Sequence, residues 1–352
     1  MKSTGNRAPA SELLSRFAAI VGEKYAVTDP AVLAPFLVEG RGLYQGRSAM
    51  LLRPGSVGEV AAILKLANDT GTPLVPQGGN TGLVGGQIPL DGELLLSLTR
   101  LDKIREVDPA SNTMTCEAGV VLAKAQEAAA DVDRLFPLSL GAEGSCTIGG
   151  NLSTNAGGTA ALAYGIARDL MLGLEVVLAD GRILQLLQKL KKDNTGYDLR
   201  HIFVGAEGTL GVITAAVLKL FPCPRAVETA FVGVPSPAAA LKLLHLAQAR
   251  AGGTVTSFEL IVREIVEFAI HHGHGVRDPL AGKHPWYVLM EVSSQHSDGL
   301  RESLEHLLAA AIEQGIVIDA TIAASLNAAM IARPMTNRRW HDIRQLCPRP
   351  KM

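Results

Sequence analysis

The sequence predicts an α+β protein of two domains, and three observations support this prediction. The chain has 352 residues, of which 47% are apolar and 19% are charged, so it can bury a sizeable core in each of two domains. Segments typical of strands and helices alternate along most of its length. The tripeptide at residues 222–224 (PCP) interrupts this alternation and is the best candidate for the boundary between the domains.

Before that boundary, short apolar segments alternate with helical ones. Ser56 and Glu59 form a capping-box pattern that opens a helix ending near Asn68. The dipeptide Asp180-Gly181 is a strong turn signal inside a hairpin over residues 170–184. We also expect strands at residues 49–52, 74–75, 94–98, 114–117 and 211–220, and a helix at residues 120–130.

After the boundary, the pattern predicts a second α+β unit with an antiparallel or mixed sheet. Ser236 and Pro237 cap and start its first helix, which runs to about Ala251. Further helices are expected at residues 263–272 and 299–314. Strands are expected at residues 229–234, 258–261, 286–292 and 316–322.

Charge and composition exclude several classes of protein. The net charge is −1, which does not favour nucleic acid or an anionic membrane as a partner. The polar stretch at residues 1–9 lacks the apolar segment of a secretory signal, and no apolar run is long enough to cross a bilayer. Cys116, Cys146, Cys223 and Cys347 have no zinc-ribbon spacing and do not indicate a disulfide framework. We therefore expect a cytoplasmic protein without a transmembrane segment.

Glycine is concentrated in two segments, residues 75–83 (VPQGGNTGL) and residues 145–158 (SCTIGGNLSTNAGG). Glycine lets backbone amides approach a ligand closely, and consecutive free amides in turns bind anions such as phosphate. A Rossmann fold would continue from the first segment into a helix, but residues 83–89 (LVGGQIP) do not have a helical pattern. Two such segments in one domain instead indicate a long ligand with a diphosphate.

Five stretches together resemble the vanillyl-alcohol-oxidase superfamily, and within it the FAD-linked D-2-hydroxyacid dehydrogenases of the D-lactate, glycolate-oxidase catalytic-subunit and D-2-hydroxyglutarate types. The resemblance implies a PCMH-type FAD-binding domain at residues 47–223, after an N-terminal extension with a helical segment at residues 1–46. It also implies an α+β substrate (cap) domain at residues 224–352, incomplete at its C-terminal end. The five stretches are residues 76–82 (PQGGNTG), 136–143 (FPLSLGAE), 147–158, 192–199 (KDNTGYDL) and 205–214 (GAEGTLGVIT).

The resemblance implies FAD contacts in four groups. The first loop would hold the diphosphate, a second stretch would lie beside the flavin ring, the second glycine loop would surround the diphosphate and ribityl chain, and a last segment would lie against the adenine or the ring edge. These groups are Pro76, Gly78, Gly79, Asn80, Thr81, Gly82 and Leu83; Pro137, Ser139, Gly141 and Ala142; Thr147, Gly150, Asn151, Thr154, Asn155, Gly157 and Gly158; and Gly208 and Ile213.

We expect the FAD to be bound non-covalently. Some related flavoproteins attach flavin through a histidine in or near the first loop, but no histidine precedes His201 in this chain. Cys146 lies inside the second glycine segment, where a small buried residue is a better interpretation than a nucleophile or a flavin attachment point.

The residues that would act on the substrate are harder to find. Oxidising a 2-hydroxy acid requires a base near the hydroxyl and a cation for the carboxylate. In the family, the base and the metal-ligating histidines belong to a Gly-His-x-Gly-Asp-Gly-Asn segment, which this sequence does not contain. We therefore identify no catalytic residue and no metal site, although a divalent metal is implied for full-length relatives. Arg344 matches a family helix whose arginine meets the substrate carboxylate; a solvated helix arginine is the alternative. Residues 271–274 (HHGH) are interpreted as a helix-to-strand connection rather than a metal site.

Two functions remain open on this basis. The first is an FAD-dependent oxidoreductase that oxidises a D-2-hydroxy acid (D-lactate, glycolate or D-2-hydroxyglutarate) to the 2-oxo acid, with hydride transfer to flavin. The second is an FAD-binding protein that is catalytically incomplete, either a truncated homologue or a subunit that needs a partner. The electron acceptor would be a quinone, a cytochrome or an electron-transferring flavoprotein.

Overall fold

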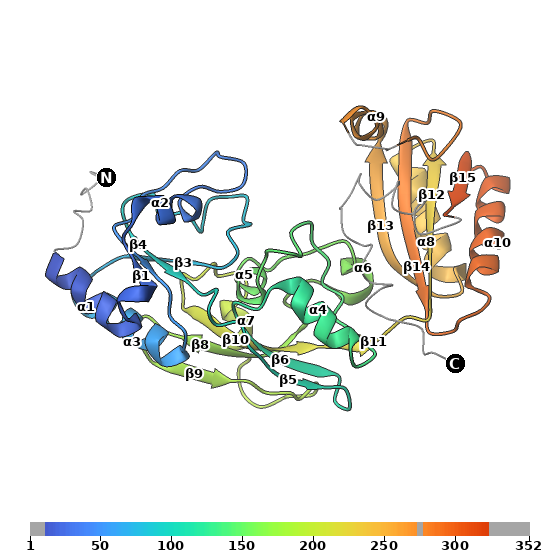
Figure 1. Ribbon diagram of the computed structural model, residues 1–352. Helices are drawn as coiled ribbons and strands as arrows, with labels where there is room; N and C mark the ends of the chain where they lie inside the picture. The colour runs from blue at the N-terminus through green and yellow to red at the C-terminus, as the bar shows by residue number, and fades with distance from the viewer. Residues whose placement is uncertain (1–10, 273–276, 324–352) are drawn as a thin grey trace. The chain divides into compact units, whose positions relative to one another are not determined.

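A computed structural model describes residues 11–272 and 277–323. The chain forms two compact units (Figure 1), and each contains segments that are distant in sequence. Among the described residues, the first unit comprises residues 11–129, Ala142–Ala156 and Ala167–Leu220. The second comprises Ala130–Gly141, Gly157–Ile166 and the described residues from Phe221 onward. The domain limits given above at residues 46 and 223 stay predictions.

The first unit contains a small four-stranded sheet with the strand order β1-β2-β4-β3. Strands β2, β4 and β3 are parallel, and β1 joins β2 antiparallel. The helices α1 and α3 pack against this sheet around a core that includes Phe17, Val60 and Ile63. The bounds are β1 (Ala26–Val27), β2 (Leu51–Leu52), β3 (Leu74–Gln77), β4 (Leu94–Ser97), α1 (Ser11–Val21) and α3 (Val57–Thr70).

The capping box predicted for α3 is present in a shifted form. The Ser56 hydroxyl accepts the amide of Glu59, as expected, but the Glu59 carboxylate accepts the amide of Gly55 rather than that of Ser56. Three short elements precede β2 in the chain: the 3-10 helices η1 (Glu23–Tyr25) and η2 (Ala34–Phe36), and the helix α2 (Pro30–Leu33).

A five-stranded antiparallel sheet with the order β5-β6-β10-β8-β9 completes the first unit. The predicted hairpin is confirmed, because β8 pairs with β9 across a turn in which Gly181 has a φ of 84°. Sequence patterning missed β5 and the short helices α5 and α7. The bounds are β5 (Ile104–Asp108), β6 (Thr113–Glu117), β8 (Met171–Val177), β9 (Ile183–Leu186), β10 (Val212–Lys219), α4 (Leu122–Ala130), α5 (Ile148–Ser153) and α7 (Arg200–Phe203).

The second unit contains a four-stranded antiparallel sheet with the order β13-β14-β12-β15, as predicted for the region after residue 224. Helices α8 and α10 cover one face (Figure 1), and α9 and α6 lie against the strand β13. The bounds are β12 (Ala226–Val234), β13 (Thr254–Val262), β14 (Trp286–Ser294), β15 (Asp319–Ile322), α6 (Ala161–Tyr164), α8 (Pro237–Arg250), α9 (Arg263–His272) and α10 (Leu300–Glu313), with β7 (Arg134–Leu135) paired to β11 (Phe221–Pro222).

The last strand begins three residues later than predicted. The amides of Ile316 and Val317 donate to the carbonyl of Ala311, so this stretch still closes the end of α10 before the chain enters β15. Within the described residues, no helix has the length and apolar character needed to cross a membrane.

Candidate functional site

Residues 78–82 of the first glycine segment form a loop directly after β3. Their backbone amides form an array of unpaired donors. In the described part of the chain, none of the amides from Gly78 to Gly82 donates a hydrogen bond. All five residues are half-buried, so their amides are near the surface without being fully solvated. Consecutive free amides in a turn form a concavity that attracts an anion. The loop therefore has the donors that a phosphate group needs.

Three side-chain amides hold this loop in shape. Asn80 has a φ of 53° and donates from Nδ2 to the carbonyls of Val38 at 2.9 Å and Pro35 at 3.2 Å. Gln87 donates from Nε2 to the carbonyl of Gly82 at 2.8 Å and to Asn80 Oδ1 at 3.2 Å. The side chain of Asn80, predicted to contact the ligand, is thus engaged with the protein, and the backbone amide of Asn80 is the group left for a ligand.

Gln77 is the third side-chain amide that supports this loop. It is 1% exposed and donates from Nε2 to the carbonyls of Phe36 at 2.9 Å and Gln87 at 3.0 Å. Its Oε1 is buried and has no hydrogen-bond partner in the described residues. Sequence patterning missed both Gln77 and Gln87, because neither belongs to a periodic pattern and their partners are backbone carbonyls more distant in sequence.

The two glycine segments meet inside the first unit. A Cβ built on Gly79 would lie 1.9 Å from the carbonyl oxygen of Ser145, and one built on Gly78 would lie 2.4 Å from Thr147 Oγ1. Gly150 lies next to Gly78, with its N and Cα each 3.7 Å from that same Cβ position. Only glycine allows the two backbones to approach this closely. The residues Gly78, Gly79, Thr147 and Gly150, all predicted to contact the cofactor, therefore lie close together.

Thr147 carries an unsatisfied hydroxyl at this junction. The residue is 3% exposed, and its Oγ1 is buried without a hydrogen-bond partner in the described residues. Thr147 also precedes α5 without capping it through its side chain. A buried hydroxyl without a partner costs about 1–3 kcal/mol. Because Oγ1 faces the glycine loop, a ligand oxygen bound there would remove that cost.

The rest of the second segment is used partly for structure. Asn151 donates from Nδ2 to Cys146 Sγ at 3.5 Å, and Thr154 donates from Oγ1 to the carbonyl of Gly150 at 3.0 Å. Burial raises the pKa of the Cys146 thiol, which is the opposite of what a nucleophile or flavin attachment point requires. Asn155 has a φ of 50°, and its Oδ1 accepts the amide of Arg168.

The segment at residues 205–208 lies against both the end of β3 and the second glycine segment. Glu207 has a φ of 51°, and its amide donates to the carbonyl of Ser153. A Cβ built on Gly208 would lie 2.5 Å from Pro76 Cγ, so these two predicted contacts are neighbours. Ile213, in contrast, is 3% exposed inside β10 and packs in the sheet.

Of the remaining predicted contacts, Leu83 and Ala142 belong to the first unit, and the others belong to the second. A Cβ built on Gly158, which has a φ of 89°, would lie 2.3 Å from the carbonyl oxygen of Ser139. The amide of Thr159 also donates to that oxygen. Pro137 is buried and Gly141 is exposed. Gly158 therefore lies directly beside Ser139.

The donors present fit a dinucleotide cofactor. The five unpaired amides and the unpartnered Thr147 hydroxyl can all donate to oxygen, and no side-chain carboxylate forms a hydrogen bond with residues 78–82 in the described part of the chain. The carboxylate of Glu207 lies next to Gly86. A diphosphate requires this combination of donors and low negative charge.

Comparison with known families agrees with this chemistry. Residues 48–187 match the model of an FAD binding domain, and residues 223–342 match the model of the C-terminal domain of FAD linked oxidases. The chain belongs to the FAD-linked oxidase family. FAD is the cofactor of this family's first domain, and the unpaired amides described above lie within the matched residues.

Two curated relatives of this chain are named D-2-hydroxyglutarate dehydrogenases. The protein from Arabidopsis thaliana is 38% identical over 319 residues, which cover 91% of this chain and 57% of the relative. The protein from Rattus norvegicus is 40% identical over 314 residues, covering 89% of this chain and 58% of the relative. The chain thus spans a little over half the length of these relatives.

A solved structure supports the PCMH-type fold. p-Cresol methylhydroxylase superposes with a TM-score of 0.71 at 17% identity, over 95% of this chain and 68% of that protein. At this identity the likeness establishes the architecture alone. It agrees with the α+β class predicted from the sequence.

The predicted cytoplasmic location is wrong. The matched proteins from Arabidopsis thaliana and Rattus norvegicus are named mitochondrial, which contradicts it. The physical reason is that a polar N-terminus bears only on secretory signals. A polar N-terminus excludes the apolar core of a secretory signal, but mitochondrial transit peptides are amphipathic and carry no such core.

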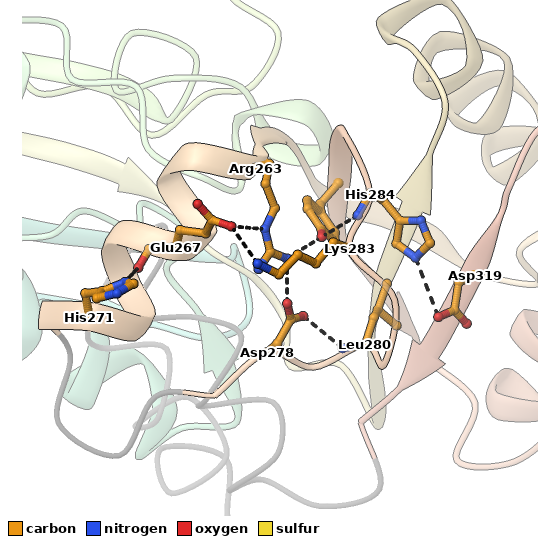
Figure 2. Close-up of polar contacts among 9 residues, drawn as sticks. Arg263, Glu267, His271, Asp278, Leu280, Lys283, His284 and Asp319 are labelled. Atoms are coloured by element: carbon orange, nitrogen blue, oxygen red, sulfur yellow. Dashed lines mark hydrogen bonds and ion pairs between the residues drawn. The ribbon is translucent and has the colours of Figure 1, made fainter.

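The second unit contains a polar cluster beside the histidines considered above (Figure 2). Figure 2 shows Arg263 between Glu267 and Asp278, to which it donates at 3.0 and 2.5 Å, and it also donates to the Tyr287 hydroxyl at 2.6 Å. Burial would lower the pKa of Arg263, but these hydrogen bonds outweigh it and raise the pKa above its ordinary value. The charges of this cluster are therefore mutually satisfied.

The histidine motif at residues 271–274 lies only partly within the described residues. His271 Nδ1 lies 2.8 Å from the carbonyl oxygen of Glu267, one turn back on its own helix (Figure 2). His274 and the predicted substrate contact Arg344 lie outside the described residues. Within residues 11–272 and 277–323, no three His, Cys, Asp or Glu side chains gather as metal ligands would.

Replacing Gln87 with alanine is expected to weaken FAD binding about tenfold without unfolding the protein. The change removes two hydrogen bonds that hold Asn80 and Gly82, so the loop loses its fixed shape before binding. Titration of the apoprotein with FAD, followed by flavin fluorescence, measures the effect. Gln295→Ala is the matched control, because Gln295 is exposed and makes one long hydrogen bond of 3.4 Å in the second unit. Equal FAD affinity in both variants would contradict a bracing role for Gln87.

Proposed function

We propose that this chain binds FAD non-covalently through the two glycine segments, and that it is the flavin-binding part of an enzyme that oxidises a D-2-hydroxy acid to the 2-oxo acid. The observation that carries the proposal is the array of five consecutive unpaired amides from Gly78 to Gly82 beside the buried, unpartnered hydroxyl of Thr147. An anionic ligand would satisfy both features.

In this proposal, the chain's own residues bind and orient the cofactor. The amides of the first loop and the hydroxyl of Thr147 donate to the diphosphate oxygens. Gly78 and Gly79 keep the two loops close enough for both to reach one diphosphate. FAD, when bound, supplies the two-electron acceptor for hydride removed from carbon 2 of the substrate.

The relatives suggest the class of substrate. The matched proteins from Arabidopsis thaliana and Rattus norvegicus are named D-2-hydroxyglutarate dehydrogenases, which makes D-2-hydroxyglutarate the first candidate, followed by D-lactate and glycolate. Arg344 would meet the substrate carboxylate, as the sequence resemblance implies. The electrons would then pass to a quinone, a cytochrome or an electron-transferring flavoprotein.

Anaerobic reduction of the bound flavin tests this function. The FAD-loaded protein is mixed with D-2-hydroxyglutarate, D-lactate or glycolate, and the oxidised-flavin absorbance is followed. One D-2-hydroxy acid is expected to bleach the flavin, whereas L-2-hydroxyglutarate is not. Bleaching that is equal with the D and L forms would contradict the stereochemical class.

FAD binding without turnover is the alternative function that this experiment also tests. The same experiment separates the two functions. A protein that retains FAD but shows no bleaching with any of the three acids would support the second function. Dithionite, a chemical reductant, is the control that shows the bound flavin can still be reduced.

A further inference from the structure

Arg168 ties together two backbone segments that border the candidate FAD site. It lies in the first unit, shortly before β8, and is half-buried. Its backbone amide donates to Asn155 Oδ1 at 3.1 Å. Its guanidinium donates from Nη1 to the carbonyl of His201 and from Nη2 to the carbonyl of Val204. Arg168 thus connects the end of the second glycine segment to the turn that follows α7.

Both connected segments have unusual backbone conformations. Asn155 has a φ of 50° and Gly205 a φ of 82°, and a Cβ built on Gly205 would lie 3.4 Å from Asn155 Cβ and 3.3 Å from Arg168 Nη2. A left-handed conformation at a residue other than glycine is uncommon and persists where its surroundings hold it. Arg168 supplies such a hold on Asn155.

The charge of Arg168 distinguishes it from other arginines of the same unit. Arg105, Arg182 and Arg200 each form an ion pair with a carboxylate. The hydrogen-bond acceptors of the Arg168 guanidinium in the described residues are instead carbonyl oxygens, with the His201 ring nitrogen Nδ1 at 3.5 Å. Carbonyl groups satisfy the donors of a guanidinium but do not cancel its charge. In the described residues, the Arg168 guanidinium forms no ion pair with a carboxylate.

We propose that Arg168 is a positioning residue for FAD, which fixes Asn155 and Gly205 through its hydrogen bonds and adds a positive charge that favours the anionic diphosphate. This inference rests on the proposed placement of FAD against the glycine segments. The Arg168 side chain would contribute to FAD binding in two ways. The geometric contribution depends on the planar guanidinium, and the electrostatic contribution is one that any cation retains.

Two substitutions separate these contributions. Arg168→Lys keeps the charge but cannot bridge the two carbonyls with one planar group, and Arg168→Gln removes the charge. Arg182→Gln is the matched control, because Arg182 is an exposed arginine paired with Asp180 in the β8–β9 turn. Each full-length apoprotein is titrated with FAD, with ADP and with riboflavin, at low and at high salt.

Arg168→Gln is expected to weaken binding of FAD and of ADP about tenfold at low salt, and to leave the weaker binding of riboflavin nearly unchanged. Salt should weaken FAD binding by the wild-type protein and by Arg168→Lys, because it screens the positive charge at position 168. The effect of salt should be much smaller for Arg168→Gln, which lacks that charge. Arg182→Gln should behave as the wild type does.

Several outcomes would overturn the inference. Equal losses in Arg168→Lys and Arg168→Gln, with unchanged salt dependence in both, would show that the residue is merely structural. Wild-type FAD affinity in Arg168→Gln would show that it has no role. Both results leave the FAD proposal intact, whereas a wild-type protein that binds neither FAD nor ADP would contradict that proposal itself.

Discussion

Replacing Gly79 with alanine is expected to reduce FAD binding at least a hundredfold. The new Cβ would lie 1.9 Å from the carbonyl oxygen of Ser145 and 2.8 Å from its carbonyl carbon, so one of the two backbones must move. Because the clash joins a Cβ to backbone atoms, no side-chain rotation can relieve it. A shift of this size separates the amides of the first loop from Thr147, which are expected to bind the same diphosphate.

Gly58→Ala is the matched control for this change. Gly58 lies in the first turn of α3, and a Cβ there would be 3.9 Å from Ser56 Oγ, an ordinary contact. It should leave FAD affinity unchanged and slightly increase the free energy of unfolding, since alanine is favoured over glycine in helices. FAD titration and chemical denaturation of the two variants give the comparison. Normal FAD affinity in a folded Gly79→Ala protein would show that the diphosphate lies elsewhere.

Replacing Glu175 with alanine is expected to lower the free energy of unfolding by about 3 kcal/mol. Glu175 is a 3% exposed residue of β8, and its carboxylate accepts hydrogen bonds from Arg105 at 3.1 Å, Thr214 at 3.0 Å and Gln185 at 3.1 Å. The three donors lie on three other strands of the five-stranded sheet. Removing Glu175 leaves them without their shared acceptor. Urea denaturation measures the loss. Glu106→Ala, which removes an exposed carboxylate paired with Lys189, should change stability by less than about 0.5 kcal/mol.

The contribution of Glu175 should depend on pH. Burial alone would raise the pKa of its carboxyl, but the hydrogen bonds from Arg105 and Thr214 outweigh burial and hold this pKa below its ordinary value. A depressed pKa in the folded state means that the stabilisation is fully present above the unfolded pKa of about 4.3 and is lost as the pH falls through the lower folded value. The stability difference between wild type and Glu175→Gln should therefore be largest near neutral pH and shrink below about pH 4. A difference that grows in acid would contradict this network.

The sequence predicted more of the fold than of the site. Apolar periodicity and turn residues located the antiparallel sheet of the second unit and the β8–β9 hairpin, because these depend on local patterns. The short helices α5 and α7 escaped prediction. Both contain fewer than seven residues and follow glycines or polar turns, so their stability comes from tertiary contacts rather than from local preference.

Within the candidate site, sequence motifs indicated which segments meet but not what each side chain does. Gly78, Gly79 and Thr147 lie together as the motif resemblance implied. The side chain of Asn80, in contrast, binds backbone carbonyls more than forty residues earlier in the chain, and Gln87 supports it. Such long-range contacts to carbonyl groups leave no local signature, so only the folded structure reveals them.

Titration of the wild-type apoprotein with FAD tests the central claim most directly. The account predicts saturable binding of one FAD per chain, competition by ADP, and release of unmodified FAD when the protein is denatured, because the cofactor is held by amides and a hydroxyl rather than by a covalent bond. A folded protein that leaves the fluorescence of added FAD unchanged would contradict the account.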